Sequence, residues 1–431
     1  MKRKSNWDCL VIGGGAAGAM AAIVAARQGQ KVLLLEKNEK IGKKIYITGK
    51  GRCNLTNAVE PEIILKNIPC NAKFLYGALN TFTSHQLMAF FEELGCPLKV
   101  ERGQRVFPVS DKSVDVLNAL DKGLSQSGVT VWKHTEVKDI ILEEERVEDA
   151  LPSEKEERRK RAIGVYLANG ETVLGKRIVL ATGGLAYPAT GSTGDGYHWA
   201  EKAGHRVEST VAGLAPIETE EQDFVAAAGF LLKNVGLTLK ADGKSLYQEQ
   251  GEVQFTRFGL SGALTLSASS YLPKEKKEEL WISLDLKPAL SQEQLDARLL
   301  REIENHRTGT VREVLKPFLP DSLFQPLIQR SGINVQKKAS EMSKKDRQSF
   351  LSLLKNLQFR VKAVRPFREA IITRGGVCVK EINPKTMESK KVKNLFLAGE
   401  ILDVDALTGG FNLQIAFSTG YLAGIQQVEE E

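Results

Sequence analysis

A glycine-rich turn between two apolar segments near the N-terminus constrains this chain more than any other feature. Residues 7–12 form an apolar run that predicts a buried strand, and Gly13-Gly14-Gly15-Ala16-Ala17-Gly18 follows it directly. An alanine-rich segment that reaches Ala26 predicts a helix, and residues 32–35 predict a second strand. A strand, a helix and a strand within about 30 residues describe a βαβ unit with parallel strands. The N-terminal part is therefore expected to be a doubly wound α/β domain.

The glycines of this turn satisfy the pattern GxGxxG in the context that predicts a dinucleotide site. Gly13 allows a tight turn, Gly15 lets the backbone approach a pyrophosphate, and Gly18 lets the helix pack closely on the strand. The helix N-terminus offers free N–H groups and the positive end of a dipole to the phosphates. Glu36 ends the second strand, where it can accept hydrogen bonds from ribose hydroxyls. This fingerprint does not distinguish NAD from FAD.

The composition narrows the class of protein. A chain of 431 residues is long enough for two to three domains, and 42% hydrophobic residues supply a sizeable core. The net charge of +7 is modest and basic residues alternate with acidic ones, so nucleic-acid binding is not implied. The sequence shows no signal peptide and no long apolar stretch, which favours a cytoplasmic protein without membrane contact. The five cysteines lack CxxC spacing and the histidines lack metal-ligand spacing, so no metal site is expected.

Patterns further along the chain predict a split nucleotide-binding domain. The apolar runs at residues 178–181 and 394–397 each end at glycines and resemble further parallel strands. Between them, residues 235–255 predict hairpins around Ala241-Asp242-Gly243, and residues 291–357 predict helices that begin with a Ser291/Gln294 capping box. The highly charged segment 143–161 is expected to be a solvated loop.

Three further elements favour FAD. Ala181-Thr182-Gly183-Gly184 resembles the ATG element of two-dinucleotide-fold flavoproteins. Ala398-Gly399-Glu400 resembles their C-terminal element, whose acid approaches the ribityl chain, and Val137 matches the position whose backbone meets the adenine. The loops at residues 48–57, 187–197 and 373–377, together with 409–414, make the similarity specific. The chain resembles the BaiN-like (aminoacetone-oxidase) family, which is related to the fumarate-reductase and succinate-dehydrogenase flavoproteins.

This resemblance spans the chain and implies a fold. It predicts an α/β, Rossmann-like FAD-binding domain that is split in sequence, with an inserted β-barrel and a small helical domain. The expected segments are 1–204 for the first part of the FAD domain, 205–290 for the barrel, 291–345 for the helical domain, and 346–431 for the barrel return and the second part of the FAD domain. One departure is Ala263, where the family pattern leads us to expect proline in a turn.

The motifs and the resemblance together assign residues to a non-covalent FAD. They are Gly13, Gly15, Ala16, Ala17, Gly18, Glu36, Lys37, Gly51, Arg52, Cys53, Asn54, Val137, Ala181, Thr182, Gly183, Gly399, Glu400, Gly410, Asn412 and Leu413. The helix that begins in 409–414 would stabilise the negative charge that gathers on a reduced flavin. The single GxGxxG leaves NAD(P)H only a transient role as electron donor, without a Rossmann domain of its own.

The expected activity is two-electron hydride transfer on a small organic substrate. Family members are associated with reduction of enone-type C=C bonds in steroid acids and with amine oxidation. An FAD-dependent reductase is favoured, and an oxygen-dependent amine oxidase or a non-catalytic FAD-binding partner protein are the alternatives. Tyr187, Arg52 and Arg374 are the catalytic candidates, with Arg105 also considered. Tyr187 could instead serve packing, and Arg105 and Arg374 could form surface ion pairs. Arg52 could contact the flavin, an anionic substrate or the pyrophosphate, and a cofactor role is preferred for it. His198 and His205 receive no role, and the sequence leaves substrate and oligomeric state open.

Overall fold

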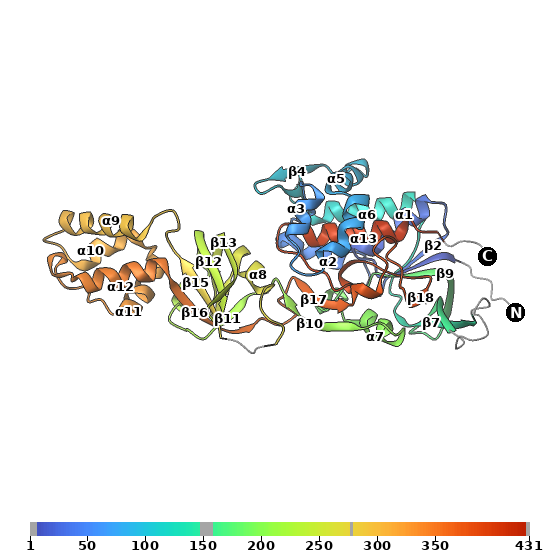
Figure 1. The fold of residues 1–431 in the computed structure, drawn as a ribbon. Coiled ribbons are helices and arrows are strands. Elements are labelled where there is room, and N and C mark those ends of the chain that lie inside the picture. The colour runs from blue at the N-terminus through green and yellow to red at the C-terminus, as the bar shows by residue number, and fades with distance from the viewer. Residues whose placement is uncertain (1–6, 147–157, 276–278, 428–431) are drawn as a thin grey trace. The chain divides into compact units, whose positions relative to one another are not determined.

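A computed structural model describes residues 7–146, 158–275 and 279–427. The described chain divides into two compact units, of which the first combines 1–213 with 370–431 and the second comprises 214–369. Figure 1 shows the blue N-terminal and red C-terminal segments interleaved within the first unit. The nucleotide-binding domain is therefore split in sequence, as predicted, and the middle of the chain is inserted into it.

The first unit is built on a mainly parallel sheet. Strand β1 (Trp7–Ile12) lies between β2 (Val32–Leu35) and β9 (Thr172–Leu180), and β19 (Leu395–Leu397) is the parallel neighbour of β9. The sheet is completed by β6 (Thr130–Trp132), β7 (Val137–Arg146), β8 (Arg158–Leu167) and β18 (Val392–Lys393). The strands predicted at 7–12, 32–35, 178–181 and 394–397 are confirmed, and nearly all of their apolar residues are buried, as expected for parallel strands that are covered on both faces.

Two helices from opposite ends of the chain pack closely on each other beside this sheet. They are α1 (Ala16–Arg27) and α13 (Phe411–Gly424), and both are buried along most of their length. A Cβ atom on Gly420 would lie 2.3 Å from the carbonyl oxygen of Ala17, so glycine is required for this approach. The buried Arg177 donates to the carbonyl oxygens of Ala423 and Gly424 and satisfies the C-terminal end of α13.

The segment 143–161 differs from its prediction at both ends. β7 and β8 continue into it as an antiparallel pair, with Glu143 opposite Arg161 and Glu144 opposite Lys160. Opposite charges that face each other across two strands stabilise a pair that buries little apolar surface. The expectation of a loop was therefore wrong for these strand ends, and residues 147–157 lie outside the described part of the chain.

Smaller elements surround the sheet of the first unit. A three-stranded antiparallel sheet has the order β3 (Thr56–Asn57), β5 (Arg105–Pro108) and β4 (Leu98–Glu101). A second antiparallel pair joins β10 (Val207–Gly213) to β17 (Ile372–Val377). The helices are α2 (Lys43–Ile47), α3 (Pro61–Lys66), α4 (Tyr76–Thr81), α5 (Ser84–Glu93), α6 (Ser113–Gln126) and α7 (Asp195–Lys202).

The second unit contains a closed antiparallel barrel, as the resemblance implied. Its strands are β11 (Ile217–Thr219), β14 (Gly259–Ser261), β13 (Lys244–Phe255), β12 (Leu231–Ala241), β15 (Leu280–Asp285) and β16 (Leu357–Val364), in that order. The predicted hairpins are a single long one that turns at Asp242 and Gly243, both with positive φ. Ala263 is the first residue of helix α8 (Ala263–Ser269), a position where proline also fits, so the departure from the family pattern leaves the helix start unchanged.

The helices of the second unit share one hydrophobic core with the barrel. They are α9 (Gln292–Asn305), α10 (Val311–Leu315), α11 (Asp321–Ser331) and α12 (Lys344–Lys355). The Ser291/Gln294 capping box is confirmed, with the Gln294 amide N–H donating to Ser291 Oγ at 3.2 Å. Leu357 was predicted in a helix but begins β16, because the barrel supplies its hydrogen-bonding partner strand. The expected boundaries at 204, 290 and 345 stay predictions.

In the part of the chain that the structure describes, no helix combines the length and apolarity needed to span a membrane.

Candidate cofactor and substrate site

The turn between β1 and α1 has the geometry of a phosphate-binding loop. A Cβ atom on Gly13, which has φ +101°, would lie 2.5 Å from the Ala181 carbonyl oxygen, and one on Gly18 would lie 1.9 Å from the Gly13 carbonyl oxygen. A Cβ atom on Gly15 would meet no protein atom within 4 Å. Packing therefore requires glycine at positions 13 and 18, whereas Gly15 faces open space at the N-terminus of α1. This helix has no acidic residue in its first turn to repel an anion.

Glu36 reaches back to this loop from the end of β2. Its buried carboxylate accepts hydrogen bonds from Gly14 N at 2.8 Å, from Asn38 N at 2.8 Å and from Asn38 Nδ2 at 2.7 Å. A carboxylate has about four acceptor positions, so one remains for a ribose hydroxyl. The next residue, Lys37, donates instead to Asp195 Oδ2 at 2.7 Å and to Thr193 Oγ1 at 2.5 Å, which ties the loop before α7 to the end of β2.

The loop 48–57 contributes an acceptor that lacks a protein partner. Asn54 Oδ1 is buried and accepts no hydrogen bond from the described residues. Gly51, with φ +84°, has open space beside its Cα atom. Cys53 is buried in a left-handed conformation, and burial raises the pKa of its thiol to about 12, so the thiol stays protonated at neutral pH, and its place in FAD binding stays a prediction. The unpaired amide oxygen fits a ligand with N–H or O–H donors, such as FAD.

Two carboxylates pair with the guanidinium group of Arg52. Its Nη2 donates to Glu101 Oε1 at 2.5 Å and its Nε donates to Asp111 Oδ1 at 2.9 Å, while the guanidinium lies 4.2 Å from the centre of the Phe107 ring. Lys99 pairs with the same Asp111 at 2.7 Å. These contacts make Arg52 a structural partner of the three-stranded sheet, and a role for it in FAD binding or catalysis stays a prediction.

Glu400 links three of the predicted segments. Its Oε1 accepts a hydrogen bond from Thr373 N at 2.7 Å, and Thr373 Oγ1 accepts from Leu185 N at 2.7 Å and from Ala186 N at 3.0 Å. Its Oε2 accepts from Lys44 Nζ at 2.5 Å. Lys44 was missed by the sequence analysis, and the only signal for it was a pair of lysines between the second strand and the loop 48–57.

The start of α13 is anchored to the three-stranded sheet. Asn57 Nδ2 donates to the Gly409 carbonyl oxygen at 3.1 Å, and a Cβ atom on Gly410 would lie 2.4 Å from the Thr56 carbonyl oxygen. Asn412 closes the preceding loop through two hydrogen bonds with the backbone of Ala406, at 2.9 and 2.7 Å. The first turn of α13 contains no acid, so its free N–H groups suit a partial negative charge.

The remaining predicted residues are distributed around this framework. Tyr187 is half-buried with φ +53°, and its hydroxyl has no hydrogen-bond partner among the described residues. Burial raises the pKa of Tyr187. Arg374 packs its side chain against Gly213 on the neighbouring strand β10, and Val137 is the buried first residue of β7. The hydroxyl of Thr182 is buried and has no hydrogen-bond partner among the described residues. Gly183 and Gly399 have positive φ. The other predicted positions are buried or half-buried, and they are Ala16, Ala17, Ala181 and Leu413.

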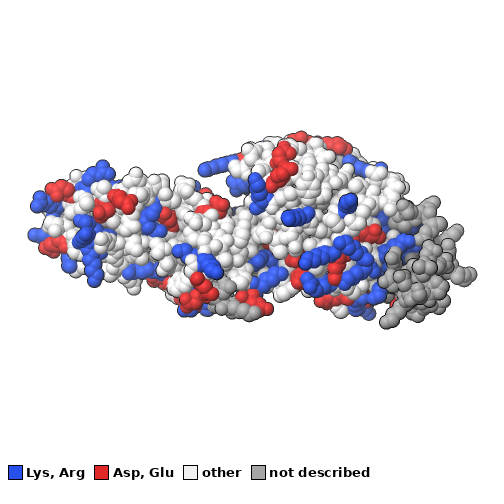
Figure 2. Space-filling view, viewed as in Figure 1, with Lys and Arg blue, Asp and Glu red and all other residues white. Residues whose placement is uncertain are grey.

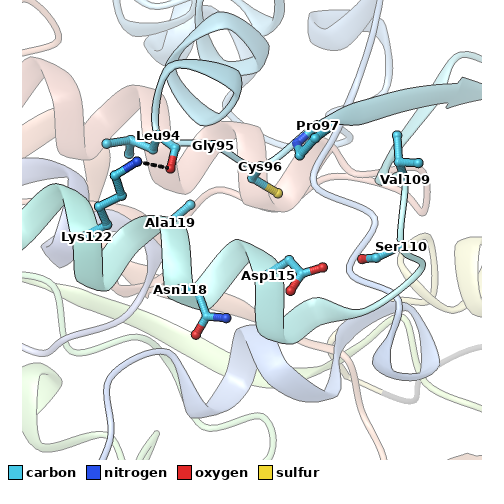
Figure 3. A pocket seen from close by; sticks show the side chains of 10 residues that line it. All are labelled: Leu94, Gly95, Cys96, Pro97, Val109, Ser110, Asp115, Asn118, Ala119 and Lys122. Carbon is cyan, nitrogen blue, oxygen red and sulfur yellow. Dashed lines mark hydrogen bonds between the residues drawn. The ribbon is translucent and has the colours of Figure 1, made fainter.

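A surface cavity of about 410 Å³ lies elsewhere in the first unit, between the end of α5 and one face of α6 (Figure 3). Its lining includes Cys96, Asp115, Asn118 and Lys122, and none of the residues predicted to bind FAD. Lys122 Nζ donates to the Leu94 carbonyl oxygen at 3.1 Å, and burial raises the pKa of the Cys96 thiol to about 11. The cavity therefore shares no lining residue with the proposed cofactor site.

Fold and site together define a flavoprotein oxidoreductase with a Rossmann-type FAD-binding domain. The chain belongs to the family described as HI0933-like protein Rossmann domain, whose model matches residues 7–426. This confirms the family that the sequence analysis identified.

Two relatives match almost the whole chain. A 3-dehydro-bile acid delta(4,6)-reductase of Clostridium scindens is 31% identical over 96% of this chain and 97% of its own length. A ribosomal RNA dihydrouridine synthase of Escherichia coli is 29% identical over 96% of both chains. Among solved structures, the 3-ketosteroid delta1-dehydrogenase of Sterolibacterium denitrificans aligns with a TM-score of 0.51 at 14% identity, over 97% of this chain and 98% of that one, which supports the fold alone.

Proposed function

We propose that this protein reduces a carbon–carbon double bond that is conjugated to a carbonyl group. The observation that carries the proposal is the chemistry common to the two full-length relatives. A delta(4,6)-reductase of a 3-dehydro-bile acid and a synthase of dihydrouridine both add two hydrogens to a C=C bond. In uracil, as in a 3-oxo steroid, a carbonyl group is conjugated to that bond and makes its far carbon electrophilic.

The reaction adds a hydride to the carbon remote from the carbonyl and a proton to the carbon beside it. FAD, when bound, supplies hydride transfer, and NAD(P)H is the proposed source of the two electrons. Tyr187 is the proposed proton donor, because its half-buried hydroxyl has no described partner and its raised pKa keeps it protonated at neutral pH. The N-terminus of α13 would stabilise negative charge on the cofactor, an effect on the order of 1 kcal/mol.

The first candidate substrate is an enone of the bile-acid type, which the relative of highest identity named above favours. A bile-acid enone is a small molecule, which agrees with the small organic substrate that the sequence analysis expects. The cytoplasm as the location of the reaction stays a prediction.

A second candidate substrate is a uridine in RNA. The Escherichia coli relative favours it, and so do four exposed lysines around the start of α12, Lys337, Lys338, Lys344 and Lys345, which form no ion pairs among the described residues. Cations of this kind bind phosphates without reading sequence. Figure 2, however, shows basic side chains interspersed with acidic ones over the helices of the second unit, so the positive surface is not continuous.

The proposal is tested by anaerobic titration of the holoenzyme with NADH and NADPH, followed by addition of an enone bile acid or of unmodified ribosomal RNA. We expect bleaching of the visible flavin band, and then its return with formation of a saturated steroid or of dihydrouridine. Return of the band only with oxygen, together with turnover of a primary amine, would establish the amine oxidase instead. Absence of turnover with every donor and acceptor would indicate a non-catalytic FAD-binding protein.

A further inference from the structure

One face of the three-stranded sheet gathers charged side chains in register. Arg105 of β5 lies between Asn57 of β3 and Glu101 of β4, because it is the direct cross-strand partner of both. Phe107 follows two residues later on the same face of β5, opposite Lys99. Directly opposed residues project to the same side of an antiparallel sheet, with Cβ atoms about 5 Å apart. The face therefore offers two basic residues and one acid beside the polar amide of Asn57.

The carboxylates near this face are already neutralised by other cations. Glu101 is paired with Arg52 at 2.5 Å and with Lys99 at 3.6 Å. Asp111 is paired with Arg52 at 2.5 Å and with Lys99 at 2.7 Å. Two cations thus serve two carboxylates, and Arg105 adds a positive charge to a group that is otherwise balanced.

Arg105 itself has no carboxylate within ion-pair distance in the described ranges of the chain. Its Nε donates to the Arg102 carbonyl oxygen at 3.1 Å, and its guanidinium lies 5.9 Å from the centre of the Phe107 ring. These contacts orient the exposed side chain and leave both terminal nitrogens without an acceptor among the residues that the structure describes. A guanidinium held in this way presents a planar pair of donors that matches a carboxylate or a phosphate.

The position of Arg105 connects it with the proposed reaction site. Its neighbour Asn57 donates to the carbonyl oxygen of Gly409, directly before α13, and the backbone of Thr56 lies against Gly410. Arg105 therefore projects from the same face of the sheet as the side chain that holds the start of α13. The N-terminus of α13 is where the cofactor's reducible end is proposed to lie.

We propose that Arg105 binds an anionic group of the substrate, a carboxylate or a phosphate, through its two terminal nitrogens. The proposal rests on the function proposed above. Arg105 then acts as a specificity residue: it favours an unsaturated acceptor that carries an anion over the same acceptor without one.

The test measures binding to the oxidised holoenzyme, through the perturbation of the flavin absorbance band, so that no turnover is needed. The probes are an enone bile acid, its uncharged methyl ester, uridine monophosphate and uridine. The variants are Arg105→Ala, Arg105→Lys and a matched control, Arg102→Ala, which removes an equal charge three residues away. For the anionic probe that the wild-type protein binds, we expect Arg105→Ala to lower the affinity by about 10- to 100-fold, as for loss of a charge-assisted hydrogen bond. The affinity for the matching neutral probe should change by less than about 2-fold.

Loss confined to the bile acid identifies a carboxylate, loss confined to the nucleotide identifies a phosphate, and Arg105→Lys should restore part of either. Equal loss for the charged and neutral probes, no loss, or an equal effect of Arg102→Ala would each overturn the role of Arg105. If the wild-type protein binds none of the four probes, the proposed function fails together with this inference. Flavin content and melting temperature of each variant establish whether it is folded. If Arg105→Ala does not fold, the affinities of Arg105→Lys for the four probes decide whether Arg105 binds the anion.

Discussion

Lys44 Nζ lies 2.5 Å from Glu400 Oε2, and both side chains are about four-fifths buried. The other oxygen of the same carboxylate accepts a hydrogen bond from Thr373 N. A short helix after the second strand, the glycine-rich turn after β19 and strand β17 therefore meet at one carboxylate. The ion pair holds an acid beside the proposed cofactor site without leaving its charge unbalanced.

Replacement of Lys44 by methionine should weaken FAD binding by about 5- to 30-fold, because the mostly buried Glu400 carboxylate loses its cation and about 1 to 2 kcal/mol of interaction. Fluorescence titration of the apoprotein with FAD measures the change. Lys44→Arg should restore most of the affinity. Lys43→Met is the matched control, since Lys43 pairs with the more exposed Glu39 at 3.4 Å. Equal effects of the two methionine variants would contradict the role of the Lys44 pair.

Two glycines of the phosphate-binding loop should respond differently to alanine. Gly15→Ala places a methyl group in open space at φ −80°, so the apoprotein should keep its stability while FAD affinity falls by at least about 10-fold. Gly18→Ala drives a Cβ atom to within 1.9 Å of the Gly13 carbonyl oxygen and should destabilise the fold itself. Chemical denaturation and FAD titration of each apoprotein separate the two effects. Undiminished FAD binding by Gly15→Ala would place the pyrophosphate elsewhere.

Tyr187→Phe should slow reduction of the C=C substrate by about 100-fold and leave reduction of the flavin by NAD(P)H unchanged, because only the reduction of the C=C bond needs a proton donated to carbon. Burial raises the pKa of Tyr187, so the wild-type rate that depends on this proton should stay constant from neutral pH up to about 10 and fall only above it. Stopped-flow measurement of the two half-reactions against pH provides the comparison. A variant that is slow in both half-reactions would point to a structural role.

His205 should make the stability of the first unit sensitive to acid. Burial lowers the pKa of His205 despite the neighbouring Glu381 carboxylate, 3.2 Å from Nδ1, and Nε2 lies 2.7 Å from Ser389 Oγ. A pKa below the unfolded value of about 6.5 means that the unfolded chain binds the proton more tightly. The stability contributed by the neutral ring is complete above pH 6.5 and is lost as the pH falls through the folded pKa. Urea denaturation of the wild type and of His205→Gln between pH 5 and 8 gives the free energy of unfolding at each pH. This free energy should change less with pH in the variant than in the wild type.

The sequence analysis succeeded where a structural feature depends on neighbouring residues. The apolar run 7–12, the spacing of Gly13 and Gly18, and the capping box at Ser291 each act over a few residues, and each has the predicted form. The analysis was wrong for the ends of the segment 143–161, because β7 and β8 continue into it as an antiparallel strand pair. A cross-strand partner at that distance cannot be read from composition.

The proposed site shows the same division. Its glycine turns and the position of Glu36 follow from short patterns, whereas the partner of each charged side chain does not. Lys44 and Glu400 are 356 residues apart in sequence, and Arg52 meets Glu101 and Asp111 only because the three-stranded sheet brings them together. The phosphate-binding loop and the split domain could be predicted because glycine spacing and apolar runs act locally, and the family was identified from its resemblance in several loops along the chain. Which cations are paired and which, like Arg105, stay available could not be predicted, because ion pairing depends on distances that folding creates between remote segments.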